Sequence, residues 1–128
     1  MTEEAVPGVT HKAAYHHGDL RAQLIAAATA LVETHGPDGF SVSLAARLAG
    51  VSTAAPYKHF KDRDAFLGGV VAAAMDRLRV AMETGAARHP VGSLEAVCAV
   101  GEAYIAFARH EPGLFRLTFG MTEGHDDA

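Results

Sequence analysis

The sequence predicts an all-α protein with a compact N-terminal group of three helices, a long connecting helix and a partial C-terminal helical domain. Three observations predict this class. Apolar residues recur at spacings of three and four over most of the 128-residue chain, the period of a helix with one buried face. Gly and Pro clusters interrupt that period at intervals. No stretch of useful length shows the strict alternation of a half-buried strand.

The composition favours a packed core. The chain is 49% hydrophobic and 20% charged, which is typical of a globular domain. Its apolar runs are shorter than the roughly 18 residues that a membrane span needs, and its first residues lack the features of a signal peptide. We therefore expect a cytoplasmic protein without a membrane partner. Cys98 is the only cysteine, which precludes an internal disulfide, and we expect it to be buried.

Each N-terminal helix follows from local signals. The first helix is expected from Asp19, a capping residue, to His35 and Gly36. Pro37–Gly39 has the residue types of a turn, which returns Phe40 to the core. The second is expected over Val42–Ala49, capped by Ser41 or Ser43, with an inner face of Leu44, Ala45 and Leu48. Gly50 then supplies a tight turn, with Val51 packed beneath it. The third is expected over Thr53–His59, with Pro56 within its first turn.

The remaining helices are longer. A helix capped by Asp62 is expected to run to Gly85, because its apolar residues form one stripe: Phe66, Leu67, Val70, Val71, Ala74, Met75, Leu78 and Met82. Another begins at Ser93 or Leu94 and is broken at Glu111–Gly113. One or two further helical turns are expected over Leu114–Met121, followed by an acidic, disordered tail.

Residues 41–63 carry the functional signal. Two short helices joined by a glycine turn form the pattern of a helix-turn-helix, whose second helix enters the DNA major groove. The stretch contains four cations and one acid: Arg47, Lys58, Lys61 and Arg63 against Asp62. The net charge is −4, but residues 1–63 hold six cations and six acids, whereas residues 64–128 hold five and nine. A neutral front half with a basic segment is compatible with a protein that presents one end to DNA.

Within this framework, residues 16–75 resemble the DNA-binding domain of the tetracycline-repressor (TetR) family of bacterial transcription regulators. The matching stretches are His17–Arg21, Gly39–Val42, Gly50–Ser52 and Ala55–Arg63. The back half resembles a ligand-domain subtype of that family through residues 103–108 and 110–117. The family pattern normally continues through several more helices, so the resemblance implies a chain truncated within the C-terminal effector domain.

The resemblance implies a role for each segment. Residues 1–15 would be a flexible arm, 16–62 the helix-turn-helix domain, 63–121 a partial ligand and dimerisation domain, and 122–128 an acidic tail. Thr53, Ala54 and Tyr57 would lie nearest the bases, although a Tyr57 ring packed on the long helix is the structural alternative. The phosphate contacts are expected to be Lys58, His59, Lys61 and Arg63, because all four lie at or just after the expected recognition helix. Their hydrogen-bonding neighbours would be Ser41, Ser43 and Ser52. The effector-pocket candidates are Tyr104, Phe107 and Phe115, with core packing as the alternative.

The functional prediction is a DNA-binding transcriptional regulator that represses from operator DNA as a homodimer and is released by a small-molecule effector. The alternative is a truncated interaction protein that associates through an exposed C-terminal apolar patch, consisting of Leu114, Phe115, Leu117, Phe119 and Met121. No catalytic residues, metal ligands or cofactor are predicted. His16 and His17, just before the first helix, are candidates for DNA backbone contacts.

Overall fold

The computed structural model describes the backbone of residues 5–127 and the side chains of residues 19–120. Within residues 5–127 the chain forms five α-helices and two 3-10 turns and no strand, which confirms the predicted all-α class. The elements are α1 (Ala5–His35), η2 (Pro37–Gly39), α2 (Val42–Ala49), η3 (Ala55–Lys58), α3 (Arg63–Ala86), α4 (Leu94–His110) and α5 (Pro112–Asp127).

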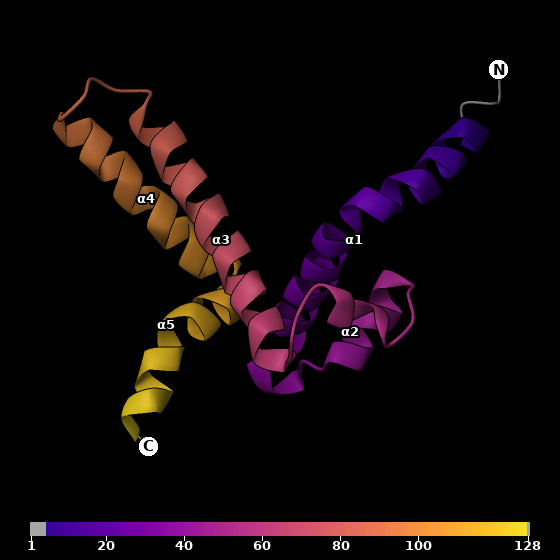
Figure 1. Cartoon of the computed structure of the whole chain (residues 1–128). Coiled ribbons are helices and arrows are strands. Elements are labelled where there is room, and N and C mark those ends of the chain that lie inside the picture. The colour runs from indigo at the N-terminus through magenta and orange to yellow at the C-terminus, as the bar shows by residue number, and fades with distance from the viewer. Residues whose placement is uncertain (1–4, 128) are drawn as a thin grey trace.

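The helices form two parts that share α3 (Figure 1). At one end, α1, α2 and η3 surround the start of α3 and make the N-terminal domain. From there α3 extends outward and α4 returns beside it as an antiparallel hairpin. The chain then turns sharply into α5, whose first turn lies against both α1 and α3. The N-terminal domain is therefore in direct contact with the last helix of the chain.

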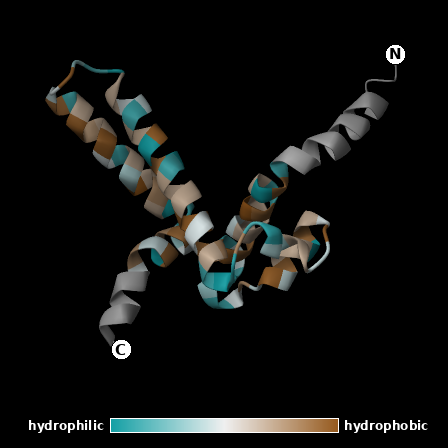
Figure 2. Ribbon diagram, in the orientation of Figure 1, coloured by the Kyte–Doolittle hydropathy of each residue, from teal (hydrophilic) through white to brown (hydrophobic). Residues whose placement is uncertain are grey.

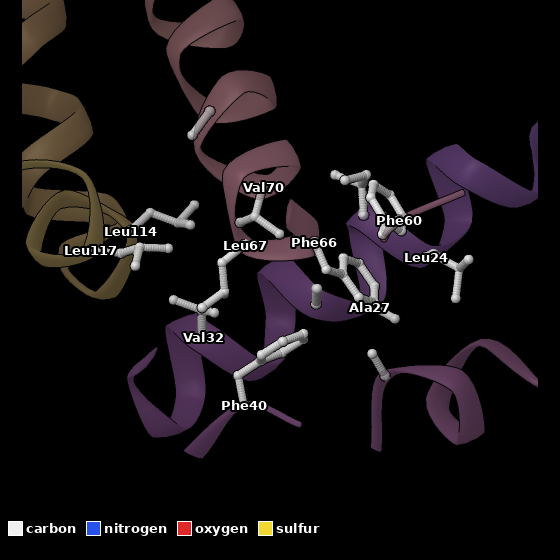
Figure 3. Packing of buried hydrophobic residues seen from close by; sticks show 14 of the residues in the cluster. Leu24, Ala27, Val32, Phe40, Phe60, Phe66, Leu67, Val70, Leu114 and Leu117 are labelled. Carbon is white, nitrogen blue, oxygen red and sulfur yellow. The ribbon is translucent and has the colours of Figure 1, made fainter. Parts of the chain in front are cut away.

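One hydrophobic core holds these elements together (Figure 3). Its centre is Phe66, which is fully buried. The Phe60 ring stacks on Phe66 at 4.3 Å between centroids, and the Phe40 ring meets Phe66 edge-on at 5.2 Å. Both are favourable aromatic geometries. Phe40 precedes α2 and Phe60 precedes α3, so this cluster fixes where the helix-turn-helix begins and where it ends.

The predicted helix ends are largely confirmed. Ser41, Asp62 and Ser93 each accept a hydrogen bond from the backbone N–H three residues later, so they cap α2, α3 and α4. Gly36 follows α1 with a φ of 79°, a conformation that favours glycine.

Two outer helix limits differ from the prediction. Helix α1 begins at Ala5, so Asp19 lies inside the helix and does not cap it. The sequence allows this earlier start, because Pro7 falls in the first turn, where its missing N–H breaks no helical hydrogen bond. At the other end, α5 continues to Asp127. The predicted disordered tail is therefore helical in its backbone over residues 122–127.

The inner face of α2 was predicted correctly at Ala45 and wrongly at Leu44 and Leu48. Leu44 and Leu48 are 41% and 58% exposed, whereas Val42, Ala45 and Ala46 are buried. Alanines with a single methyl group allow α2 to lie close to α1, which leaves the two leucines on the opposite side. The helical spacing was correct, but more than one face of this short helix is apolar.

Helix α4 gives a second correction. Cys98, expected to be buried, is exposed. The helix packs on α3 through small residues, and Ala99 lies against Gly85 of α3. Cys98 falls on the other side, together with five exposed apolar residues: Leu94, Val97, Val100, Tyr104 and Ile105. Hydrophobic positions occur along the length of α4 (Figure 2).

The predicted C-terminal apolar patch also differs. Leu114 and Leu117 are buried beside Val32 and Leu67 and belong to the core (Figure 3). Phe115 is half-buried and Phe119 is 41% exposed, while the side chain of Met121 lies outside the described residues. Helix α5 turns two leucines toward the N-terminal domain, so the exposed apolar surface lies mainly on α4.

No helix in the described part of the chain is long and apolar enough to cross a membrane.

The aromatic cluster makes Phe66 the most sensitive core position. We expect Phe66→Ala to lower the free energy of unfolding by about 3–5 kcal/mol, because it removes a fully buried ring and leaves a cavity. Urea denaturation followed by far-UV circular dichroism measures this loss. Val80→Ala, at an exposed site of the same helix, is the matched control and should change stability by less than about 0.5 kcal/mol. A loss below about 1 kcal/mol for Phe66→Ala would show that the cluster does not anchor the domain.

Candidate nucleic-acid interface

The interface is built on the turn between α2 and η3. Gly50 ends α2 with φ 78° and ψ 28°, a left-handed conformation that glycine adopts without steric cost. The Val51 N–H then donates to the Ala46 carbonyl at 3.0 Å, which closes the end of the helix. Val51 packs against the core as predicted. The chain therefore leaves α2 in a fixed direction.

The following segment, residues 52–61, is called here the recognition segment. It was predicted as an α-helix over Thr53–His59, but it forms a 3-10 turn over Ala55–Lys58. Pro56 gives the physical reason, because it has no N–H to donate to the Ser52 carbonyl. That carbonyl instead accepts from the Ala55 N–H at 3.1 Å, three residues away, and Tyr57 N–H donates in the same way to Ala54.

The recognition segment is anchored from beneath. Ala55, Pro56 and Phe60 are buried, and Phe60 stacks on Phe66. The guanidinium carbon of Arg21 lies 5.0 Å from the centre of the Phe60 ring, where a cation is attracted to the ring face. The apolar side of the segment is therefore held by α1 and α3, and its other side chains face outward.

Of the ten predicted DNA contacts, nine are exposed: Ser43, Ser52, Thr53, Ala54, Tyr57, Lys58, His59, Lys61 and Arg63. The tenth, Ser41, is half-buried, and its hydroxyl oxygen accepts from the Leu44 N–H at 3.0 Å. Tyr57 is 56% exposed, so its ring is not packed on the long helix. The structure thus brings the predicted residues to one end of the molecule and leaves nine of the ten exposed there.

Arg63 has partners inside the protein. Its Nη2 donates to the Pro37 carbonyl at 2.8 Å and to the Phe40 carbonyl at 3.2 Å. Its guanidinium carbon also lies 5.4 Å from the centre of the Phe40 ring. Arg63 therefore ties the end of the recognition segment to η2. This structural role was not predicted, because residues 37 and 63 are far apart in sequence.

The effector-pocket candidates do not line one cavity. Tyr104 and Phe107 both meet the ring of Phe115 edge-on, at 5.9 and 6.3 Å between centroids. Phe107 also lines an open pocket of about 270 Å³ between α3 and α4, together with Arg77, Leu78, Ala81, Ala103, Ala106, His110 and Glu111. One predicted effector residue therefore borders a pocket, and the other two belong to an aromatic cluster.

Other predictions concern metals and the histidines. Among the described residues, no group of three or more His, Cys, Asp or Glu side chains is placed to hold a metal ion. The side chains of His16 and His17, the candidates for backbone contacts, lie outside the described residues.

Sequence patterns did not identify Glu33. Its carboxylate accepts from the Gly113 and Leu114 N–H groups, at 3.1 and 3.2 Å. The only signal in the sequence is an acid in the last turn of α1, and a charge at such a position is usually explained by exposure to solvent.

Comparison with known proteins agrees with this geometry. Residues 24–70 match the family described as bacterial regulatory proteins, tetR family. A solved structure titled as a protein with unknown function from Rhodococcus sp. RHA1 is similar, with a TM-score of 0.71 and 40% sequence identity. The match covers 83% of this chain and 55% of that chain, so this chain spans about half the length of that relative. None of the curated proteins compared matches this chain.

The contacts of Arg63 predict a loss of stability in a variant that keeps the charge. Arg63→Lys should lower the free energy of unfolding by about 1 kcal/mol, because the lysine nitrogen lies one bond short of the Nη2 that reaches both carbonyls, and the planar group over the Phe40 ring is lost. Urea denaturation measures the effect. Arg47→Lys, at an exposed position of α2, is the matched control. Unchanged stability of Arg63→Lys would instead favour a role confined to phosphate contact.

Proposed function

We propose that this chain, which belongs to the tetR family of bacterial regulatory proteins, represses transcription by binding operator DNA through its recognition segment. The family is one of DNA-binding transcriptional regulators, and the matched residues 24–70 contain the whole helix-turn-helix. The observation that carries the proposal is the recognition segment itself, which is held on an aromatic core and leaves Tyr57, Lys58 and Lys61 exposed. The protein would act in the bacterial cytoplasm.

Three side chains are proposed to lie nearest the bases: Thr53, Ala54 and Tyr57. In a 3-10 turn, side chains three residues apart eclipse one another, which supports a shared direction for Ala54 and Tyr57. A small Ala allows the backbone to approach and contacts a thymine methyl, while the Tyr57 hydroxyl reaches a base edge or a phosphate.

The phosphate contacts are proposed to be Lys58, His59 and Lys61, which are all exposed on the recognition segment. Ser41, Ser43 and Ser52 would add neutral hydrogen bonds at the edges. Arg63 is proposed to contribute mainly by holding η2, since two of its donor interactions are with backbone carbonyls. Phosphate contacts fix the register of a protein on DNA, whereas base contacts give specificity.

The regulatory part of the proposal concerns residues 63–121. Residues 16–62 would form the DNA-binding domain, and the helices that follow would carry the effector and dimer functions. A homodimer would place two recognition segments about 34–36 Å apart, one turn of DNA. A small molecule in the pocket bordered by Phe107 would favour a conformation that no longer fits the operator.

A second function is favoured by the exposed apolar residues of α4. Leu94, Val97 and Ile105 are each more than half exposed, and such a surface is typical of a protein contact. Under this alternative the chain associates through α4 and does not bind DNA productively alone. Size-exclusion chromatography with light scattering, combined with DNA titration, separates the two. A dimer that protects a palindrome supports the repressor, and a monomer without salt-sensitive DNA binding contradicts it.

The proposed base contact predicts a sequence-dependent effect. Tyr57→Ala should weaken binding to an operator selected from random duplexes by about tenfold, while the stability of the exposed site changes little. Fluorescence anisotropy against selected and scrambled duplexes measures both affinities. Tyr57→Phe is the control that isolates the hydroxyl. Equal weakening on all sequences would show that Tyr57 contacts phosphate.

The proposed phosphate contact predicts a different effect. Lys61→Ala should weaken binding to every sequence equally and reduce the slope of log affinity against log salt by about 0.9, the value for one lost phosphate contact. Anisotropy titrations at several salt concentrations give this slope. A change in sequence preference at constant slope would contradict the assignment of Lys61.

A further inference from the structure

We propose that Glu33 is a positioning residue that couples the C-terminal helices to the recognition segment. The inference rests on the proposed function, since it concerns how DNA affinity responds to the rest of the chain. Its basis is the corner between α4 and α5, residues 110–114, which two side chains from the body of the molecule hold in place.

The first of these side chains is Glu33 itself. Its Oε2 accepts from the Gly113 N–H at 3.1 Å and its Oε1 from the Leu114 N–H at 3.2 Å, so the carboxylate satisfies two backbone donors at the start of α5. A negative charge at the N-terminus of a helix is also favourable because of the helix dipole. The residue is half-buried, which shields these hydrogen bonds from solvent.

The backbone of the corner is packed closely against the backbone of α1. A Cβ added to Gly113 would lie 2.7 Å from the Val32 carbonyl oxygen and 2.9 Å from the Glu33 Cα, so only glycine fits. The next residues, Leu114 and Leu117, are buried in the core beside Val32 and Leu67 (Figure 3). The first turn of α5 is thus packed directly on the end of α1.

The second side chain is Arg77 of α3. Its Nη1 lies 2.9 Å from both carboxylate oxygens of Glu111, the residue between α4 and α5. Both residues line the pocket of about 270 Å³, together with Phe107 and His110. A molecule bound in this pocket would therefore contact the same corner that Glu33 holds through Gly113 and Leu114.

From Glu33 the contacts continue toward the recognition segment. Helix α1 ends at His35, two residues after Glu33, and Pro37 follows in η2. The Pro37 carbonyl accepts from Arg63, which directly follows the recognition segment and the cap of α3. Displacement of the corner would therefore move α1 and η2, and with them the support of the recognition segment. A measurement of linkage between the corner and the recognition segment tests this coupling.

Linkage makes that measurement possible without knowledge of the effector. If the corner and the recognition segment are coupled, DNA binding must stabilise or destabilise the corner by the same factor by which the corner changes DNA affinity. We propose that DNA stabilises it. Amide hydrogen exchange at Gly113 and Leu114 reports the corner, and anisotropy with the same selected duplex reports affinity.

In the unmodified chain, we expect saturating DNA to slow exchange at Gly113 and Leu114 by about fivefold, at the lower end of typical coupling. In Glu33→Gln, exchange without DNA should rise by about tenfold, because one charge-assisted hydrogen bond is lost. The slowing by DNA should then disappear, and DNA affinity should fall by about fivefold. Glu102→Gln makes the same chemical change at an exposed site of α4 and should alter none of these values.

Each other outcome contradicts a specific statement. If the unmodified chain binds no duplex, the proposed function and the coupling are both wrong. If it binds DNA without a change in exchange at the corner, or if Glu33→Gln keeps the DNA-dependent slowing, the coupling is wrong and the proposed function stands. If Glu33→Gln unfolds the protein, Arg77→Gln tests the same corner, since it removes an exposed ion pair of small stabilising energy. That variant must also reduce the slowing by DNA, or the coupling is wrong.

Discussion

The burial of Phe66 between the rings of Phe40 and Phe60 is the constraint on which the rest of the structure depends. These three residues come from the turn before α2, the end of the recognition segment and the first turn of α3. Their contact fixes both ends of the helix-turn-helix relative to one helix. A 3-10 turn of four residues has few hydrogen bonds of its own, so it depends on this core for its conformation. Affinity for DNA would thus be supported by residues that never reach the DNA.

Much of this fold was predictable because its signals are local. Asp62 was identified as a cap from its residue type and position, and Ser41 as one of two candidate caps. Ser93 was one of two predicted helix starts, and Gly50 followed from the need for a tight turn. Long-range packing was less predictable. Leu44 and Leu48 have the spacing of a buried pair, but the alanines of α2 pack on α1 instead. Cys98 lies in an apolar segment, yet α4 has apolar residues on two sides and only one side faces α3.

In the candidate site too, the exposed residues were predictable from local signals and the residues with long-range partners were not. Exposed residues such as Tyr57 and Lys61 were placed correctly at the surface because a helix-turn-helix has a known direction of approach to DNA. Arg63 and Glu33 are joined to partners 26 and up to 81 residues away, and no sequence period indicates such pairs. Both residues are charged, and charged residues near a surface are ordinarily assumed to face solvent. Their hydrogen bonds to backbone groups become visible only in the folded chain.

Helix α3 also has a mechanical consequence. It starts inside the aromatic core and continues for 24 residues to the loop that leads into α4. At about 1.5 Å per residue its length is about 36 Å, so a tilt of about 5° at its buried end would move its far end by about 3 Å. A small rotation of α3 within the core would therefore be accompanied by a large displacement of the α3–α4 hairpin at its far end.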